Sequence, residues 1–152
     1  AAAIFGFDVS WAVPKGYEPD DDVVSRAKKI AESSGSKLIE TNDPIEAVKD
    51  ADVVYTDVFV SMGEEHLEGK MKDFSGFQIN EELVSNAKDD YIFMHCLPAH
   101  RGDEVTDSVI DSKNSVVFDQ AENRMWAQMS ILTYLINKTA WDTYSELSEI
   151  EY

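Results

Sequence analysis

The apolar residues of this chain fall into short runs that are separated by amphipathic stretches. The runs are rich in β-branched and aromatic residues, and they predict strands at residues 7–13, 37–40, 52–59, 91–96 and 115–118. Around them, helix-forming composition or apolar positions three to four residues apart predict helices at residues 1–6, 20–34, 44–51, 80–88, 102–111, 120–137 and 139–152. Alternating strands and helices form a parallel sheet with right-handed crossovers. We therefore expect an α/β fold, a three-layer α/β/α Rossmann-like domain.

Residues that favour helix ends support these boundaries. Asp20 begins an acidic triplet at the start of one predicted helix, where the helix dipole favours negative charge, and Gly35 ends that helix. Pro44 suits the first turn of the next helix, because no backbone donor is needed there. Asn80 is a capping residue, and Gly6 suits the end of the first helix. The helix boundaries are therefore predicted from residue chemistry as well as from periodicity.

Composition narrows the class of protein. At 152 residues and 43% hydrophobic content, the chain is one domain by size and can build a core. The net charge of −17 at pH 7 argues against binding to nucleic acid or an anionic membrane, and it indicates either a solvated acidic surface or a docking site for a basic partner. No apolar run approaches the roughly 20 residues of a membrane span, and no secretory signal is visible. A single cysteine excludes an internal disulfide, so we expect a cytoplasmic protein.

Two reactive side chains follow the apolar run at residues 91–94. The run ends at His95 and Cys96, and Pro98 ends any strand because it has no N–H to donate. Ligands bind at the carboxyl edge of open parallel sheets, so both residues are candidates for a site. Cys96 is a small buried hydrophobic residue or a reactive thiol. His95, on the opposite face of a regular strand, is a core histidine or a substrate contact.

Other candidate chemistries have less support. Asp57 comes near the end of the strand predicted at 52–59, where a carboxylate binds a ligand, caps a helix or faces solvent. Zinc binding by His95, Cys96 and His100 is disfavoured, because adjacent strand residues diverge and no Cys-x-x-Cys partner exists. No Gly-x-Gly-x-x-Gly segment is present, so dinucleotide binding lacks its main signature. We expect neither a metal nor a cofactor.

His95-Cys96-Leu97-Pro98 resembles the signature of the ornithine carbamoyltransferases. Three more segments resemble motifs of that family and occur in the family's order, namely residues 14–19, residues 57–63 (the ornithine-binding loop) and residues 121–124. The resemblance extends over nearly the whole chain but covers only the second, ornithine-binding half of such an enzyme. It implies transfer of the carbamoyl group from carbamoyl phosphate to the δ-amine of L-ornithine, which gives citrulline and phosphate in arginine metabolism.

The resemblance implies roles for residues on the ornithine side of the site. Asp57 would bind the α-ammonium group of ornithine, and Ser61 and Met62 would belong to the loop that closes on the amino acid. Cys96 would lie beside the δ-amine and orient or deprotonate it. Leu97 would offer a backbone group to the carbamoyl moiety.

The resemblance also implies roles around the carbamoyl group. Arg124 matches an arginine that contacts this group, and its guanidinium would polarise the carbonyl, although a surface arginine paired with an acid is the alternative. Glu122 would orient that arginine. His95 would orient its neighbours or contact the substrate. The implied catalytic residues are Cys96 and Arg124, and both would bind carbamoyl phosphate together with Leu97.

The resemblance predicts how the chain is divided and what it acts with. Residues 1–138 would form the ornithine-binding domain, and the helix at 139–152 would pack on a carbamoyl-phosphate-binding domain through the apolar stripe of Trp141, Tyr144, Leu147 and Ile150. In the family's sheet order, 3-2-1-4-5-6, the first and central strand would precede residue 1, so we expect it to be missing from the chain. The family's phosphate-binding motifs, Ser-Thr-Arg-Thr and His-Pro-x-Gln, are absent as well. The chain alone would then supply half an active site and be inactive, and a homo-oligomer such as a trimer would complete the enzyme.

Two alternative functions stay open. A related carbamoyltransferase would use another amine acceptor, such as putrescine or an acylated ornithine, and product formation with each amine would separate the two. A non-catalytic domain would keep the amino-acid pocket without turnover. The absent phosphate motifs support that second alternative, and ornithine binding without any product would favour it.

Overall fold

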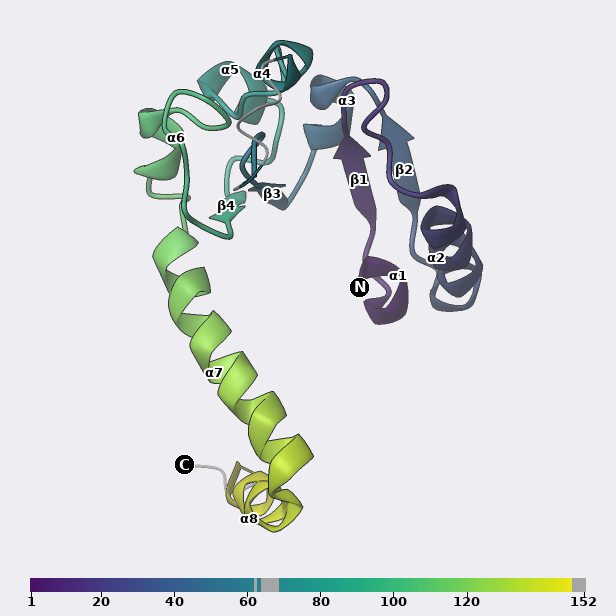
Figure 1. The fold of residues 1–152 in the computed structure, drawn as a ribbon, viewed down its shortest axis with the longest axis vertical. Helices are drawn as coiled ribbons and strands as arrows, with labels where there is room; N and C mark the ends of the chain where they lie inside the picture. The colour runs from purple at the N-terminus through teal and green to yellow at the C-terminus, as the bar shows by residue number, and fades with distance from the viewer. Residues whose placement is uncertain (62, 64–68, 149–152) are drawn as a thin grey trace.

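The computed structural model describes residues 1–61, 63 and 69–148 (Figure 1). Its elements, in chain order, are α1 (Ala2–Phe5), β1 (Val9–Ala12), α2 (Asp21–Ser34), β2 (Leu38–Thr41), α3 (Pro44–Val48), β3 (Val53–Thr56), α4 (Lys70–Asp73), α5 (Glu81–Val84), β4 (Ile92–His95), α6 (Asp107–Ile110), α7 (Val117–Ile136) and α8 (Lys138–Ser148). Strands and helices alternate through the first part of the chain, as the apolar runs predict. Met62 and the last four residues of the helix predicted at 139–152 lie outside the described residues.

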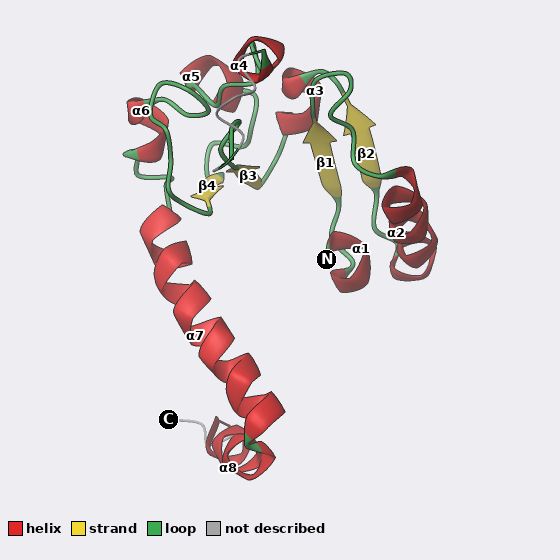
Figure 2. Cartoon of the chain, in the orientation of Figure 1, coloured by secondary structure: helices red, strands yellow, loops and turns green. Residues whose placement is uncertain are grey.

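The strands form two parallel pairs (Figure 2). β1 pairs with β2, and β3 pairs with β4 in a register that sets Thr56 opposite His95. No hydrogen-bonded ladder joins the two pairs among the described residues. The resemblance-based sheet order places one further strand between β1 and β3, and the described part of the chain contains no strand there. The parallel pairing confirms the predicted α/β, Rossmann-like fold class.

The strand predicted at 115–118 is wrong. Ser115 forms only an isolated parallel bridge with Phe93, and Val117 already begins α7. The N–H of Phe93 donates to the carbonyl of Asn114 at 2.8 Å, and the N–H of Val116 donates to the carbonyl of Phe93 at 3.0 Å, so the pairing ends within two residues. The β-branched run indicates burial rather than a strand here, because Val117 is 1% exposed at the start of a helix.

The predicted helix ends are confirmed where a side chain or a glycine sets them. The carboxylate of Asp20 accepts hydrogen bonds from the N–H groups of Asp22 and Val23, at 3.0 and 3.2 Å. Gly35 ends α2 with a φ of 78°, which is the left-handed conformation that glycine adopts without strain. Asn80 caps α5 through the N–H of Leu83 at 2.9 Å.

Three predicted helices are shorter than expected, and the first of them, expected at 44–51, ends at Val48. The helix expected at 80–88 ends at Val84, and the one expected at 102–111 begins only at Asp107. The segment before Asp107 is held in an extended form by Ile79, whose N–H donates to the carbonyl of Glu104 at 2.8 Å and whose carbonyl accepts the N–H of Thr106 at 3.0 Å. These hydrogen bonds join two distant segments of the chain, and they compete with helix formation before Asp107. A single helical turn, α4, precedes α5 where no helix was predicted.

The main core lies around the β3–β4 pair. Phe93 of β4 is fully buried at its centre. The core residues come from α3, α5, α6, β3, β4, the start of α7 and the segments next to them, and they are Val48, Val54, Ile79, Leu83, Val84, Tyr91, Phe93, Val105, Val109, Ile110 and Val117. The β1–β2 pair joins this unit through α3, which contacts β1, β2 and α5. The core therefore supports the carboxyl ends of β3 and β4 directly.

Helix α7 extends away from both strand pairs, and α8 packs against its far end (Figure 1). The rings of Tyr134 and Trp141 meet edge to face there, with centroids 5.4 Å apart. Much of α7 is apolar and exposed, and its exposed large residues are Phe118, Met125, Trp126, Met129, Ile131, Leu132, Tyr134, Leu135 and Ile136. Within the described residues, no helix is both long enough and apolar enough to cross a membrane.

Candidate functional site

The carboxyl ends of β3 and β4 bring Asp57 and Cys96 together. Because Thr56 is opposite His95 in the parallel register, the next residue of each strand leaves the sheet at the same edge. The thiol of Cys96 donates a hydrogen bond to Oδ1 of Asp57 at 2.9 Å, although the two residues are 39 positions apart. Two residues that the sequence proposes for one site are therefore in direct contact.

The contact shapes the acidity of Asp57. The hydrogen bond from Cys96 holds the pKa of the Asp57 carboxyl below its ordinary value, and a second bond from the N–H of Val58, at 2.7 Å, acts in the same direction. Partial burial opposes both effects. Both bonds end on Oδ1, and Oδ2 accepts none from the described residues. Asp57 thus offers an anionic oxygen toward a cationic ligand group.

The same contact keeps Cys96 in its neutral form. Burial raises the pKa of the Cys96 thiol, and the neighbouring Asp57 carboxylate raises it further, while the hydroxyl of Tyr55 acts in the opposite direction. The thiolate is the nucleophilic form of cysteine, so a raised pKa leaves little of it at neutral pH. The geometry therefore favours a neutral thiol that orients a ligand over a covalent nucleophile.

His95 turns away from this edge into the core. Its ring is fully buried, Nδ1 accepts the N–H of Leu97 at 2.8 Å, and Nε2 lies 3.1 Å from Oε1 of Glu104. Because Nδ1 is an acceptor, the ring proton lies on Nε2 and is donated to Glu104. Of the two roles considered for His95, the structure supports orientation of its neighbours. Leu97 is held with a φ of 55°, a conformation that is uncommon for a residue with a side chain.

Arg124 reaches the same strand end from α7. Its Nη1 donates to the carbonyl of Cys96, with a separation of 3.4 Å, and the side chain remains exposed. Gln120, one turn earlier, accepts the N–H of His95 at 3.0 Å and donates to the hydroxyl of Tyr55 at 3.3 Å. The first two turns of α7 are therefore fixed against β3 and β4. A guanidinium placed there can donate to a carbonyl oxygen of a ligand.

The remaining predicted site residues are Ser61, Met62 and Leu97. Ser61 is exposed and follows Asp57 by one short loop, and Met62 lies outside the described residues. The N–H of Leu97 is used by His95, so its carbonyl is the backbone group that is left to face a ligand. The described residues contain no group of three His, Cys, Asp or Glu side chains arranged around a common point.

Three residues of the site have no signal in the sequence. Glu104, Gln120 and Tyr55 all contribute hydrogen bonds around His95 and Cys96. Glu104 is fully buried and also accepts the N–H of His100 at 2.6 Å. An acidic residue in a polar turn is indistinguishable from a solvated one in sequence. Only the buried histidine, which needs a partner for each ring nitrogen, points to such an acceptor.

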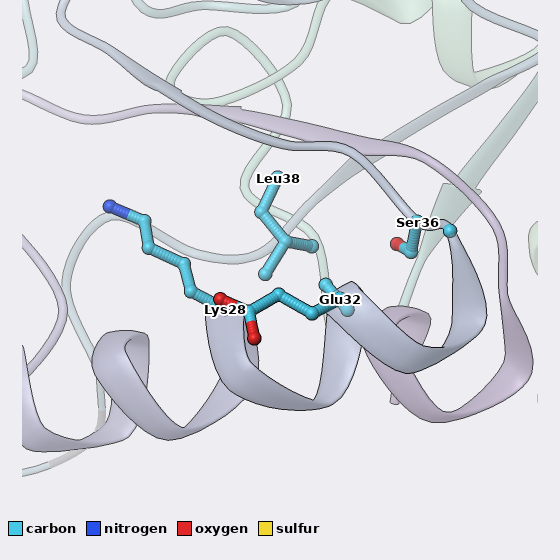
Figure 3. Close-up of a pocket in the computed structure, with 6 residues that line it drawn as sticks. Lys28, Glu32, Ser36 and Leu38 are labelled. Atoms are coloured by element: carbon cyan, nitrogen blue, oxygen red, sulfur yellow. The ribbon is translucent and has the colours of Figure 1, made fainter.

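A separate shallow hollow lies beside α2 (Figure 3). It is lined by Lys28, Ala31, Glu32, Gly35, Ser36 and Leu38. Lys28 and Glu32 are four residues apart on one helix face, which is the usual spacing of a solvated ion pair. None of the residues that the sequence proposes for chemistry lies in this hollow.

Comparison with known proteins gives a consistent result. Residues 1–135 match the family model described as "Aspartate/ornithine carbamoyltransferase, Asp/Orn binding domain". The catabolic ornithine carbamoyltransferase of Thermoplasma volcanium is 61% identical over 137 residues, which are 90% of this chain and 45% of that protein.

Two solved structures share the fold. The ornithine carbamoyltransferase of Pyrococcus furiosus has a TM-score of 0.82 at 57% identity, over 86% of this chain and 42% of that chain. The anabolic ornithine carbamoyltransferase of Campylobacter jejuni has a TM-score of 0.85 at 45% identity, over 90% of this chain and 46% of that chain. This chain thus spans less than half the length of each of these relatives.

Proposed function

This chain belongs to the Asp/Orn-binding domain family of the aspartate/ornithine carbamoyltransferases, and on that premise we propose that it provides the ornithine site of an ornithine carbamoyltransferase. The reaction joins the δ-amine of L-ornithine to the carbonyl carbon of carbamoyl phosphate, and phosphate leaves. The products are citrulline and inorganic phosphate. The contact between Cys96 and Asp57 is the observation that supports this proposal most directly, because it joins two residues with suitable chemistry at one sheet edge.

Asp57 binds the α-ammonium group of ornithine. Its lowered pKa keeps the carboxylate ionised at neutral pH, and a charged hydrogen bond to an ammonium is among the stronger polar interactions. Ser61 and Met62 belong to the segment that follows and contact the same amino acid. Exclusion of water around this group would strengthen its attraction to Asp57.

Cys96 orients the δ-amine for attack. The neutral thiol is a weak donor and acceptor, so it can align an uncharged amine without forming a bond to the carbamoyl carbon. Leu97 offers its carbonyl to the amide group of the carbamoyl moiety, since His95 occupies its N–H. Alignment of the two reactants is itself a large source of rate acceleration.

Arg124 stabilises the charge that develops on the carbamoyl oxygen. Attack by the amine moves electrons from the carbonyl double bond onto oxygen, and guanidinium N–H groups are suited to stabilise that charge. The bond from Nη1 to the carbonyl of Cys96 holds the guanidinium over the strand end. In this role Arg124 contacts the reacting group, while Gln120 and His95 fix the backbone beneath it.

The chain acts with a carbamoyl-phosphate-binding domain and within a homo-oligomer such as a trimer. Residues 1–138 form the ornithine-binding domain, and the segment at 139–152, for which the sequence predicts a helix, packs on the other domain. The exposed apolar residues on α7, and the attachment of α8 at its far end, support this arrangement. The single cysteine supports a cytoplasmic location.

Replacement of Asp57 by alanine tests the proposal. In a complete transferase that contains this domain, Asp57→Ala should raise the ornithine KM about 100-fold, because a charged hydrogen bond is worth on the order of 2–3 kcal/mol. Citrulline formation is measured against ornithine concentration. Asp52→Ala is the matched control, because Asp52 lies at the other end of β3 and pairs with Lys88 on the surface. An ornithine KM that is unchanged in Asp57→Ala contradicts the assignment.

The acceptor is identified with the same assay. Ornithine, putrescine and N-acetylornithine are compared as substrates at equal concentration. Preference for ornithine supports the proposal, and preference for either of the others replaces it with a related carbamoyltransferase. Binding of ornithine without product from any amine indicates a non-catalytic domain.

A further inference from the structure

Four aromatic rings form a cluster near the candidate site, and we call Tyr17, Phe59, Phe74 and Phe77 the aromatic cluster. Phe74 is at its centre, with its ring centroid 4.7 Å from that of Phe59, 4.9 Å from that of Tyr17 and 6.1 Å from that of Phe77. The hydroxyl of Tyr17 donates to Oδ2 of Asp73 at 2.9 Å. Aromatic pairs at these distances stabilise beyond their buried area.

The aromatic cluster is separate from the main core and joins three segments of chain. None of its members belongs to the core cluster around Phe93. Tyr17 comes from the turn that follows β1, Phe59 follows β3, and Phe74 and Phe77 follow α4. The N–H of Tyr17 donates to the carbonyl of Pro14 at 3.1 Å, which fixes that turn to the end of β1. The cluster therefore links the carboxyl ends of the two strand pairs, between which the described residues form no ladder.

The link reaches the candidate site through Phe59. Phe59 is 8% exposed, and its backbone is two residues from Asp57 on one side and two from Ser61 on the other. Its ring stacks on Phe74 at an interplanar angle of 29°, so the position of Phe74 limits the position of the 57–61 backbone. Phe74 is in turn next to Asp73, the acceptor for Tyr17.

We propose that Tyr17 and Asp73 are positioning residues for the amino-acid acceptor: their hydrogen bond holds Phe74 against Phe59 and thereby fixes the 57–61 segment that binds ornithine. The inference rests on the proposed function. Neither residue contacts the reacting atoms, and the bond affects the acceptor side of the site only. Loss of the bond keeps all four rings in the chain but loosens the contact of Phe74 with Phe59, and the 57–61 segment then moves. Acceptor affinity falls while the rate at saturation is unchanged.

Steady-state kinetics of the complete transferase test this inference. Tyr17→Phe keeps the ring and removes only the hydroxyl, and it should raise the ornithine KM about three- to tenfold, which is the effect of one net hydrogen bond. The kcat, the KM for carbamoyl phosphate and the melting temperature should stay at the wild-type values. Asp73→Ala should have the same effect, and Asp73→Asn, which keeps an acceptor oxygen, should restore the wild-type KM.

Two controls make the result specific. Tyr134→Phe also removes a tyrosine hydroxyl from an edge-to-face aromatic pair, the pair that Tyr134 of α7 forms with Trp141. It should leave kcat, both KM values and the melting temperature unchanged. The double variant Tyr17→Phe/Asp73→Ala should raise the ornithine KM no further than the single variants do, because both substitutions remove the hydrogen bond between Tyr17 and Asp73.

The kinetic results distinguish failure of this inference from failure of the proposed function. If the wild-type enzyme forms no citrulline from ornithine, the proposed function fails and this inference fails with it. If the wild-type enzyme is active but Tyr17→Phe leaves the ornithine KM unchanged, or changes kcat and both KM values alike, only this inference is overturned. Additive effects in the double variant also overturn it.

Discussion

The two strand pairs of this molecule differ in how firmly they are packed. β3 and β4 each contain a buried core residue, Val54 and Phe93, and residues of α3, α5, α6 and α7 join the same core. In β1 every residue is half-buried, and in β2 the two central residues are exposed. The candidate site lies at the carboxyl ends of β3 and β4, the more deeply buried pair. Chemistry that needs a fixed geometry is thus placed beside the main core, and the β1–β2 pair contacts that unit through α3 and the aromatic cluster.

Truncation of one large residue in each pair tests this difference. Phe93→Ala should lower the free energy of unfolding by about 3–5 kcal/mol, because it leaves a cavity in a fully packed core. Ile39→Ala, in β2, should cost about 1 kcal/mol or less, because that side chain is 47% exposed. Urea unfolding measures both. Equal losses would show that the two pairs are supported alike and would remove the comparison.

The buried pair of His95 and Glu104 tests how much a polar contact contributes to stability in the core around β3 and β4. Glu104→Ala should cost about 2–3 kcal/mol of unfolding free energy, because the His95 ring and the N–H of His100 lose their acceptor in the core. Glu104→Gln keeps an acceptor oxygen and should cost less than half as much. Glu82→Ala, an exposed glutamate of α5, is the control. A similar cost for Glu104→Ala and Glu82→Ala would contradict the role given to the buried pair.

The smallest expected effect is on the pH at which the Cys96 thiol becomes reactive. Because burial and Asp57 raise its pKa, alkylation of the thiol by iodoacetamide should accelerate only above the ordinary thiol pKa of about 8.5. Any stability that the neutral thiol contributes is present below that pH and is lost as pH rises through the raised pKa. Asp57→Asn removes the negative charge and should move the alkylation midpoint to lower pH. Mass spectrometry follows the reaction without ambiguity, since the chain has one cysteine.

A midpoint that stays in place in Asp57→Asn would contradict the electrostatic role of Asp57. Alkylation of the unfolded chain supplies the reference midpoint. A folded midpoint at or below that reference would show that the thiol is not held in its neutral form.

Much of this fold is predictable because its strands are short, apolar and parallel. Runs such as 52–59 and 91–96 pack against neighbouring helices. An apolar run indicates a buried segment, so these strands could be predicted. The same reason explains the failure at 115–118, where Val117 is buried by a helix start. The extended segment around Val105 was not predictable either, because its partner is Ile79 and the pairing has no local signal.

The candidate site was predictable only in part. Asp57 and Cys96 follow adjacent strands, so the topology alone brings them to one edge. Glu104 and Gln120 act through contacts made by the folded chain, and neither has a distinctive neighbour in sequence. The roles of all the proposed site residues stay predictions that kinetics must test, and these residues are Asp57, Ser61, Met62, Cys96, Leu97 and Arg124.

The parallel register of β3 and β4 has a consequence for how this protein can change over evolutionary time. Asp57 and Cys96 meet because each is the first residue after a paired position. Insertion or deletion of one residue within either strand would shift that strand's side chains to the opposite face and separate the pair. Length variation among descendants of this sequence should therefore fall in the turns before β3 and β4 and spare the strands themselves.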